Sequence, residues 1–474
     1  MSRRPGMMAV VLGALAGCSL APHYQRPTVP APPATYKEAG DWKVATPADR
    51  TARGRWWTMF NDPELDALEA QVSDSNQNLK AALARLDEAR AQTRIARSNW
   101  FPTIDAQADL TRGENSIYSP NYVPGKPRTG NSIIVGGDFS YELDLFGRIR
   151  NTVASAHATE QATAGDAAAL DLALHAELAS DYFTVRGLDI EQQLLDHTVD
   201  DYAHALELTE NLYHGGAAAI ADVRQAQAQL ESARTQAEDT RLRRAQSEHA
   251  IAVLVGRQAS DFTLSAHSAA GLGTLPAVDV GLPSQLLERR PDVAAAERRV
   301  AAANANIGVA RAAYFPVLDI MGSLGTQSLA TSTLFTAPAR YWSIGPQALL
   351  TVFDGGLHAA QSAQAHAAYD EQVANYRAVV LSAFQDVEDN VVALRQLERE
   401  SVSEAAAVTA TQGALEQANL RYKGGLVTYL EVVSTENAAL AARLAEADIG
   451  IRRASATVLL VKALGGDWHP PATP

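Results

Sequence analysis

The architecture of this chain is decided by the stretch Leu286–Pro316, LLERRPDVAAAERRVAAANANIGVARAAYFP, because it recurs. A copy lies 214 positions earlier, and each copy is an Ala/Arg-rich run that ends at Phe-Pro and continues into an alternating, strand-like segment. An internal repeat of this kind indicates that the fold is built from two similar structural units. The residues that match between the two copies are Ala81 and Ala295, Ala82 and Ala296, Arg85 and Arg299, Ala91 and Ala305, Ala96 and Ala310, Arg97 and Arg311, Phe101 and Phe315, Pro102 and Pro316, and Asp105 and Asp319.

A second correspondence follows at an offset of 209, and it needs no gap. It aligns four glycines: Gly147, Gly215, Gly216 and Gly256 with Gly356, Gly424, Gly425 and Gly465. The repeat predicts one body built from two similar halves, residues 63–256 and residues 283–467. Residues 257–282, rich in Gly and small polar residues, are the predicted linker between them, and residues 468–474 form a C-terminal tail.

The composition favours long helices in close contact over one large globular core. Of the 474 residues, 47% are apolar but only 6% are aromatic, and alanine supplies much of the apolar share. The formal net charge of −14 argues against a nucleic-acid partner.

The N-terminus has the pattern of a secretion signal. Two arginines precede an apolar run that is too short to span a bilayer as a helix. The run ends at Leu-Ala-Gly-Cys, and because Cys18 is the only cysteine, disulfides and thiolate metal sites are excluded. The quartet resembles the bacterial lipobox, which implies that residues 1–17 are a signal peptide and that Cys18 is lipidated. An ordinary signal peptide with an incidental cysteine is the alternative.

Residues 18–62 are then a lipidated N-terminal tether. Within it, residues 19–56 are rich in Pro, Ala and Thr without a hydrophobic period, which predicts an extended segment with little helix. Ser19 follows the cysteine, and by the same resemblance this favours sorting to the outer membrane. Asp62, Pro63 and Glu64 predict the start of a helix, with Asp62 as its cap, that runs to about Ser98.

Each half contains two segments in which apolar and polar residues alternate. They cover residues 103–112 and 132–145 in the first half, and residues 317–327 and 341–353 in the second. One apolar and one acidic face along strands of about ten residues is typical of a transmembrane barrel with a wet lumen. The edge of a soluble β-sandwich is the alternative. Within the last segment Pro346 predicts a bulge or irregular pairing.

Four strands cannot close a barrel, since bacterial outer-membrane barrels have at least about eight. If these strands span the membrane, the chain must therefore form an oligomer.

The helical arms have matching lengths in the two halves. The proline-free segments Arg148–His214 and Leu357–Lys423 each cover 67 residues, and Ala217–Val255 and Leu426–Leu464 each cover 39. As helices these arms would be about 100 Å and about 60 Å long. The helix before each strand pair, Glu64–Ser98 or Pro283–Ala312, would complete the shorter arm. Helices of this length favour coiled-coil packing.

The sequence shows little sign of catalytic or metal chemistry. It has no G-x-S-x-G motif, no phosphate loop and no His/Glu metal spacing. His197 and His204 would share a helix face, but solvated positions on a long helix explain them better than a metal site does. We therefore expect neither an enzyme nor a bound cofactor.

Together these features resemble the outer-membrane efflux protein family (TolC-like), and within it the NodT-type lipoproteins of resistance-nodulation-division pumps. The most specific parts are residues 287–292 (LERRPD), residues 146–148 (FGR), residues 353–356 (FDGG) and the two Tyr-x-x-Gly turns. The resemblance implies a mainly α-helical homotrimer with a twelve-stranded transmembrane β-barrel and a periplasmic tunnel of twelve helices. It also implies a periplasmic adaptor protein and an inner-membrane transporter as partners.

The two turns that end the long arms are the predicted functional positions. Glycine lets a helical hairpin reverse its direction and lets another helix tip approach the backbone, although two ordinary reversals would need glycine as well. By resemblance the turns dock the adaptor. Some relatives carry an acidic gate residue just after the second turn, but this chain has Val427 or Thr428 there, so Asp222 and Glu431 are the candidate gate charges instead. The candidate docking residues are Tyr213, Gly215, Gly216, Tyr422, Gly424 and Gly425.

Four acidic residues of the first strand pair would make the barrel lumen acidic: Asp109, Asp138, Glu142 and Asp144. An acidic lumen should favour cationic or neutral solutes over anions.

Three functions remain open at this point. The first is the exit duct of a drug efflux pump, which the lipobox and the RRPD residues favour. The second is the exit duct of a peptide or protein secretion system with the same fold. The third, from a different class, is a structural periplasmic lipoprotein without a pore.

Overall fold

The computed structural model describes residues 19–29, 37, 54–118, 120, 123–125, 127–266, 275–276 and 289–466. The predicted signal peptide, Cys18, most of the tether and linker, and the C-terminal tail lie outside the described residues. The chain divides into two compact units. We call residues 1–28, 85–163 and 295–376 the sheet unit, and residues 29–84, 164–294 and 377–474 the hairpin unit.

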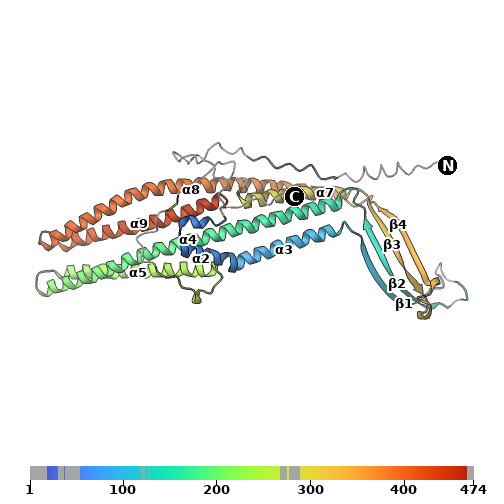
Figure 1. The fold of residues 1–474 in the computed structure, drawn as a ribbon, viewed down its shortest axis with the longest axis horizontal. Helices are drawn as coiled ribbons and strands as arrows, with labels where there is room; N and C mark the ends of the chain where they lie inside the picture. Colours follow the sequence, from blue (N-terminus) through green and yellow to red (C-terminus); the bar gives the residue numbers. More distant parts are fainter. Residues whose placement is uncertain are drawn as a thin grey trace. The chain divides into compact units, whose positions relative to one another are not determined.

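The sheet unit contains four antiparallel strands in the order β1-β2-β3-β4 (Figure 1). Each neighbouring pair keeps one continuous register. The predicted bulge at Pro346 is therefore wrong. Pro346 pairs regularly with Ile320, and it lies on an edge strand of the sheet, where proline is tolerated. The strands are β1 (Thr103–Glu114), β2 (Thr129–Glu142), β3 (Val317–Ser328) and β4 (Arg340–Leu349).

The strand register aligns the predicted alternation of apolar and polar residues across all four strands. Directly opposed residues point to the same side of a sheet, so Ile104 shares a face with Phe139, and Asp105 shares the other face with Asp138. The apolar face is largely uncovered, and Ile104 and Trp342 are 75% and 77% exposed. The opposite face, which we call the polar face, carries Asp, Ser and Gln from all four strands.

The described part of the tether, residues 19–29, is extended and held by side-chain contacts within the sheet unit. The Tyr24 hydroxyl donates to Glu297 Oε1 at 2.9 Å, and the Asn304 amide donates to the Pro22 carbonyl at 2.9 Å. Glu297, which accepts the first of these hydrogen bonds, and Asn304, which donates the second, both belong to α7 (Pro291–Ala312). This part of the tether is thus fixed along a helix.

The two longest helices begin and end where the sequence predicts. They are α4 (Arg148–His214) and α8 (Leu357–Lys423), each of 67 residues. Their partners α5 (Ile220–Leu254) and α9 (Tyr429–Ala463) each have 35 residues rather than the predicted 39. The shorter length follows from the turns, because Ala219 and Thr428 are extended and precede the first helical residue.

The single helix predicted from Glu64 to Ser98 is wrong. It is broken at Asn76 into α2 (Pro63–Ser75) and α3 (Gln77–Ser98). The buried Asn76 side chain caps α3 by accepting from the backbone N–H groups of Asn78 and Leu79, and it donates to the Leu254 carbonyl at 2.8 Å. These contacts stabilise an extended residue where a helix would otherwise continue.

The second predicted short helix also differs in length. The sequence predicts it from Pro283, but α7 begins at Pro291, which occupies its first turn, and residues 281–288 lie outside the described part of the chain.

The largest hydrophobic core of the described residues lies in the hairpin unit. It joins the 3₁₀ turn η2 (Trp56–Phe60) and α2 to α4, α5 and α9. Fully buried members include Leu65, Leu178, Ile251 and Val458.

Candidate functional site

The first hairpin tip is a helix C-cap built on two glycines. Gly216 has φ +76°, a left-handed conformation that glycine adopts without strain. Its N–H donates to the Tyr213 carbonyl at 2.9 Å, and the next N–H, of Ala217, donates to the Leu212 carbonyl at 2.8 Å. These two bonds define a Schellman motif, which satisfies the last carbonyls of α4 and turns the chain toward α5.

The second tip repeats this geometry. Gly425 has φ +68°, its N–H donates to the Tyr422 carbonyl at 2.9 Å, and the Leu426 N–H donates to the Arg421 carbonyl at 2.9 Å. The sequence repeat therefore extends to the individual hydrogen bonds of both turns. Gly215 and Gly424 precede the left-handed residues, and neither has a positive φ.

The two hairpins pack together behind their tips. Ala226, Ala418, Tyr429, Val432 and Val433 form a buried cluster of α5, α8 and α9 residues, against which α4 also packs. Apolar side chains remain uncovered on both tips: Tyr213, Ile220, Leu426 and Leu430. Tyr422 behaves differently from Tyr213, because its ring lies 5.6 Å from that of Tyr429 and packs against the cluster.

The candidate gate charges make contacts within their own hairpins. The Asp222 carboxylate accepts from the Ala219 N–H at 3.2 Å and so caps the first turn of α5. Glu431 forms an ion pair with Arg421 at 2.6 Å, which joins α9 to α8 beside the turn.

The four acids predicted to line the lumen lie in two kinds of position. Asp109 and Asp138 lie on the polar face of the sheet. Glu142 ends β2 and is bound by Arg148, with nitrogen–oxygen distances of 2.8 and 2.5 Å. Asp144 lies beyond the strand, which was predicted to reach Leu145, and it accepts from the backbone N–H groups of Ile149 and Arg150. It therefore caps α4 rather than extending the strand's polar face.

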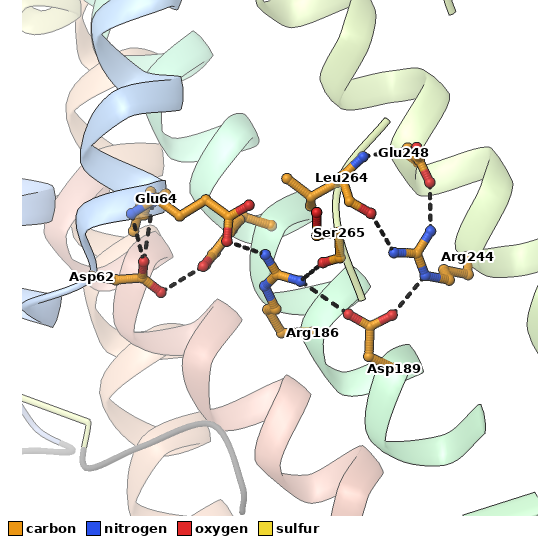
Figure 2. Close-up of polar contacts among 10 residues, drawn as sticks. Asp62, Glu64, Arg186, Asp189, Arg244, Glu248, Leu264 and Ser265 are labelled. Carbon is orange, nitrogen blue, oxygen red and sulfur yellow. Dashed lines mark hydrogen bonds and ion pairs between the residues drawn. The ribbon is translucent and has the colours of Figure 1, made fainter. Parts of the chain in front are cut away.

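A largely buried chain of ion pairs joins three helices of the hairpin unit, α2, α4 and α5 (Figure 2). Asp189 of α4 lies between two guanidinium groups, with contacts of 3.0 Å to Arg186 and 2.6 Å to Arg244. Arg244 also pairs with Glu248 at 2.5 Å, and Arg186 contacts Glu64 of α2. Every charge of this network faces an opposite charge, although the buried Nε of Arg186 has no hydrogen-bond acceptor.

The same two arginines hold the beginning of the predicted linker (Figure 2). Arg186 donates to the Ser265 carbonyl at 2.7 Å, and Arg244 donates to the Leu264 carbonyl at 2.8 Å. Glu248 accepts from the Leu264 N–H at 3.0 Å. This linker segment is thus bound through its main chain, and the Leu264 side chain is buried in the hydrophobic core as well.

The sequence analysis missed this network, although the repeat carries a signal for it. Arg243 and Arg244 match Arg452 and Arg453 at the offset of 209, and Asp189 matches Glu398. In the second hairpin Arg453 does pair with Glu398, but Glu398 is 60% exposed whereas Asp189 is 2% exposed.

A second buried polar group links α2 to α4. His175 Nδ1 contacts Glu69 Oε2 at 2.5 Å, and the Trp57 ring stacks on the imidazole at 4.4 Å. Burial alone would lower the pKa of His175, but hydrogen bonds with Asp171 and Glu69 raise it to about 9. Burial raises the pKa of Glu69 to about 7.

This pair predicts a pH-dependent stability. Both groups keep their protons to a higher pH in the folded chain than in the unfolded chain, so the pair's contribution is largest at low pH and falls as the pH rises through about 9. We expect the thermal unfolding temperature, followed by circular dichroism, to fall between about pH 7 and pH 9. His175→Gln should flatten this fall, and an unchanged slope in that variant would contradict the assignment.

Within the described residues, no group of three or more His, Cys, Asp or Glu side chains is arranged to hold a metal ion. His204, one of the two histidines considered from sequence, contacts the Asp200 carbonyl one turn earlier at 2.8 Å. None of the described helices combines the length and apolar character that crossing a bilayer requires.

The sequence pattern of the outer membrane efflux protein family matches residues 68–257 and 282–466. The chain belongs to this family. Outer membrane protein OprJ of Pseudomonas aeruginosa is 32% identical over 475 residues, which span 98% of this chain and 95% of OprJ. Cation efflux system protein CusC of Escherichia coli K12 is 31% identical over 458 residues, which span 96% of this chain and 97% of CusC.

Solved structures of outer-membrane channels have the same fold. The channel OprN aligns with a TM-score of 0.87 and 30% identity over 95% of this efflux protein and 99% of OprN. The open state of Neisseria gonorrhoeae MtrE aligns with a TM-score of 0.81 and 29% identity over 96% of this chain and 100% of MtrE. These likenesses are at odds with a pore-less structural lipoprotein, and the efflux protein is an outer-membrane protein.

Proposed function

We propose that this efflux protein is the passive outer-membrane exit duct of a tripartite pump. It would receive drugs or other small toxic solutes from a periplasmic adaptor and an inner-membrane resistance-nodulation-division transporter, and release them outside. The observation that carries the proposal is the four-stranded sheet, which has an exposed apolar face and an opposite polar face. Such a sheet suits a wall between lipid and a wet lumen.

The cargo class rests on the relatives and on the lumen charges. CusC is named for cation efflux, and Pseudomonas putida relatives at 31% identity are named for toluene or antibiotic efflux. Asp105 and Asp138 lie directly opposite each other on the polar face. An acidic lumen wall favours cationic or neutral solutes over anions.

Efflux from cells tests the function. Deleting the gene should raise the accumulation of a cationic fluorescent dye, and the parent gene supplied in trans should restore the lower level. Unchanged accumulation of cationic, neutral and anionic probes, in a strain without another exit duct, would contradict the proposal.

The assembly we propose is a homotrimer. Within one chain β1 and β4 are edge strands, and four strands are fewer than the eight or so that close a barrel. Three copies would supply twelve strands and pair every edge. Light scattering of the detergent-extracted protein should therefore give about three chains of 50.5 kDa before corrections for detergent and processing. A monomer with full β-structure would contradict this assembly.

The tips are the proposed docking surface for the adaptor. Both are glycine turns with uncovered apolar side chains beside them, including Leu426, which is 74% exposed. A small turn with apolar rims suits the tip of another helical hairpin. Asp222 and Glu431 remain the proposed gate charges. The Glu431–Arg421 ion pair lies within one hairpin and is exposed on both sides.

Lipidation of Cys18 is the proposed anchor of the N-terminus. If Cys18 carries acyl chains, Cys18→Ser should abolish labelling by radioactive palmitate. Because the strands would hold the membrane as well, we expect partial efflux to remain. Equal label on the variant and the parent protein would show that the lipobox interpretation is wrong.

A further inference from the structure

One row across the sheet differs from the rows on either side. Its members are Gln107, Gly136, Gly325 and Tyr341, which lie directly opposite one another on β1, β2, β3 and β4. The row lies on the polar face, two positions from the row that contains Asp105 and Asp138. Among the described strand residues on this face, Tyr341 is the only aromatic one.

The ring of Tyr341 lies across the two glycines. A Cβ atom added to Gly325 would come within 3.1 Å of Tyr341 Cε1, and one added to Gly136 would come within 2.9 Å of the Tyr341 hydroxyl. Since Gly325 is on the adjacent strand and Gly136 on the strand beyond, the side chain reaches over two strands along the sheet surface. It is only partly exposed, although most of β4 is exposed.

Close approach, rather than backbone conformation, explains these glycines. Neither has a positive φ, so another residue could adopt the same backbone angles. A Cβ at Gly136 would also lie 2.5 Å from the Leu324 carbonyl oxygen, and one at Gly325 would lie 2.5 Å from that of Val135. The two bare backbones therefore form a shallow slot that a tyrosine ring fills.

We propose that Gly136 and Gly325 hold Tyr341 flat against the lumen wall, and that this row sets the bore of the duct at its level. The inference rests on the proposed barrel, in which the polar face lines the lumen. In a trimer three such rings lie at one level. Turned inward, three phenol rings would obstruct the passage, whereas in the slot each ring narrows it only by the thickness of a ring that lies flat.

Two positions on β3 bracket the row and allow a matched test. Ser323 and Gln327 share the polar face with Gly325, two residues to either side. β3 follows α7 and ends in the loop that leads to β4, so Ser323 lies on the helix side of the row and Gln327 on the loop side. With the helices in the periplasm, a reagent added from outside passes Gln327 before it reaches Ser323.

The experiment measures how fast Ser323→Cys and Gln327→Cys react, in the full-length protein in whole cells, with thiol reagents of graded size added outside. The parent protein, whose only cysteine is Cys18, gives the background. Tyr341→Ala should speed the reaction of large reagents at position 323 several-fold and leave position 327 unchanged. Gly136→Ala should slow the reaction of large reagents several-fold at position 323 and leave position 327 unchanged. Combining it with Tyr341→Ala should restore the rate at position 323.

The outcomes separate this inference from the proposed function. If neither cysteine reacts with even the smallest reagent, the polar face does not line an open lumen and the proposed duct is wrong. If both cysteines react but Tyr341→Ala does not change the reaction rate at position 323, the proposed duct stands and the inference about its bore is overturned. Because a Cβ at Gly136 would lie 2.5 Å from the Leu324 carbonyl oxygen, Gly136→Ala also displaces the backbone. Reaction rates of this variant are therefore compared only in preparations that form heat-resistant trimers. The Tyr341→Ala result decides without it.

Discussion

Asp189→Ala is expected to lower the free energy of unfolding by about 3–5 kcal/mol, because it removes one partner from a buried ion-pair network. The Asp189 side chain is 2% exposed and contacts both Arg186 and Arg244. Without it, two guanidinium groups lose a carboxylate in a place where water cannot replace it. Chemical denaturation of the purified protein, followed by far-ultraviolet circular dichroism, measures the loss.

The repeat supplies the control for this variant. Glu398 occupies the equivalent position in the second hairpin and pairs with Arg453, but it is 60% exposed. Glu398→Ala should therefore cost no more than about 1 kcal/mol, as exposed ion pairs usually do. Equal losses in the two variants would show that burial of the network does not determine its contribution.

Gly216→Val and Gly425→Val are expected to cause the largest loss of efflux. Both positions have positive φ, where a β-branched residue is strained on the order of 1–3 kcal/mol. The valine side chain would also project into open space, since nothing lies within 4 Å of a Cβ at either glycine. It would thus occupy the surface proposed to receive the adaptor. We expect efflux and adaptor cross-linking to fall while trimers persist.

Gly215→Ala and Gly424→Ala are the matched controls for the tips. A Cβ at Gly215 or Gly424 would come no closer than 3.4 or 3.5 Å to neighbouring atoms, and neither residue has a positive φ. These variants should fold and form trimers like the parent protein. Normal efflux in both valine variants would contradict the docking proposal, as would loss of the trimer together with efflux, because the turns would then serve folding alone.

Much of the fold could be predicted from sequence because its elements are long and regular. The absence of proline and the flanking glycines predicted the bounds of α4 and α8, and strict alternation predicted the four strands. The break at Asn76 could not be predicted, because one of its hydrogen bonds reaches Leu254, 178 positions away. Nothing near Asn76 in the sequence indicates that partner.

The candidate sites were predictable to a similar extent. Repeated glycines indicated both tips, since a turn's left-handed residue is usually glycine. Spacing alone could not show that Asp144 caps α4 or that Glu431 is paired with Arg421. Likewise, the repeat pairs Asp189 with Glu398, but only the structure shows that the linker segment Leu264–Ser265 accompanies the buried network of the first hairpin.

The central claim is that this chain forms a passage through the outer membrane. Recording currents across planar lipid bilayers after adding the purified full-length protein tests it most directly. The predicted result is discrete conductance steps, each from one inserted trimer, with cations favoured over anions. Protein that inserts as a trimer into the same bilayers but gives no steps at any voltage would contradict the account.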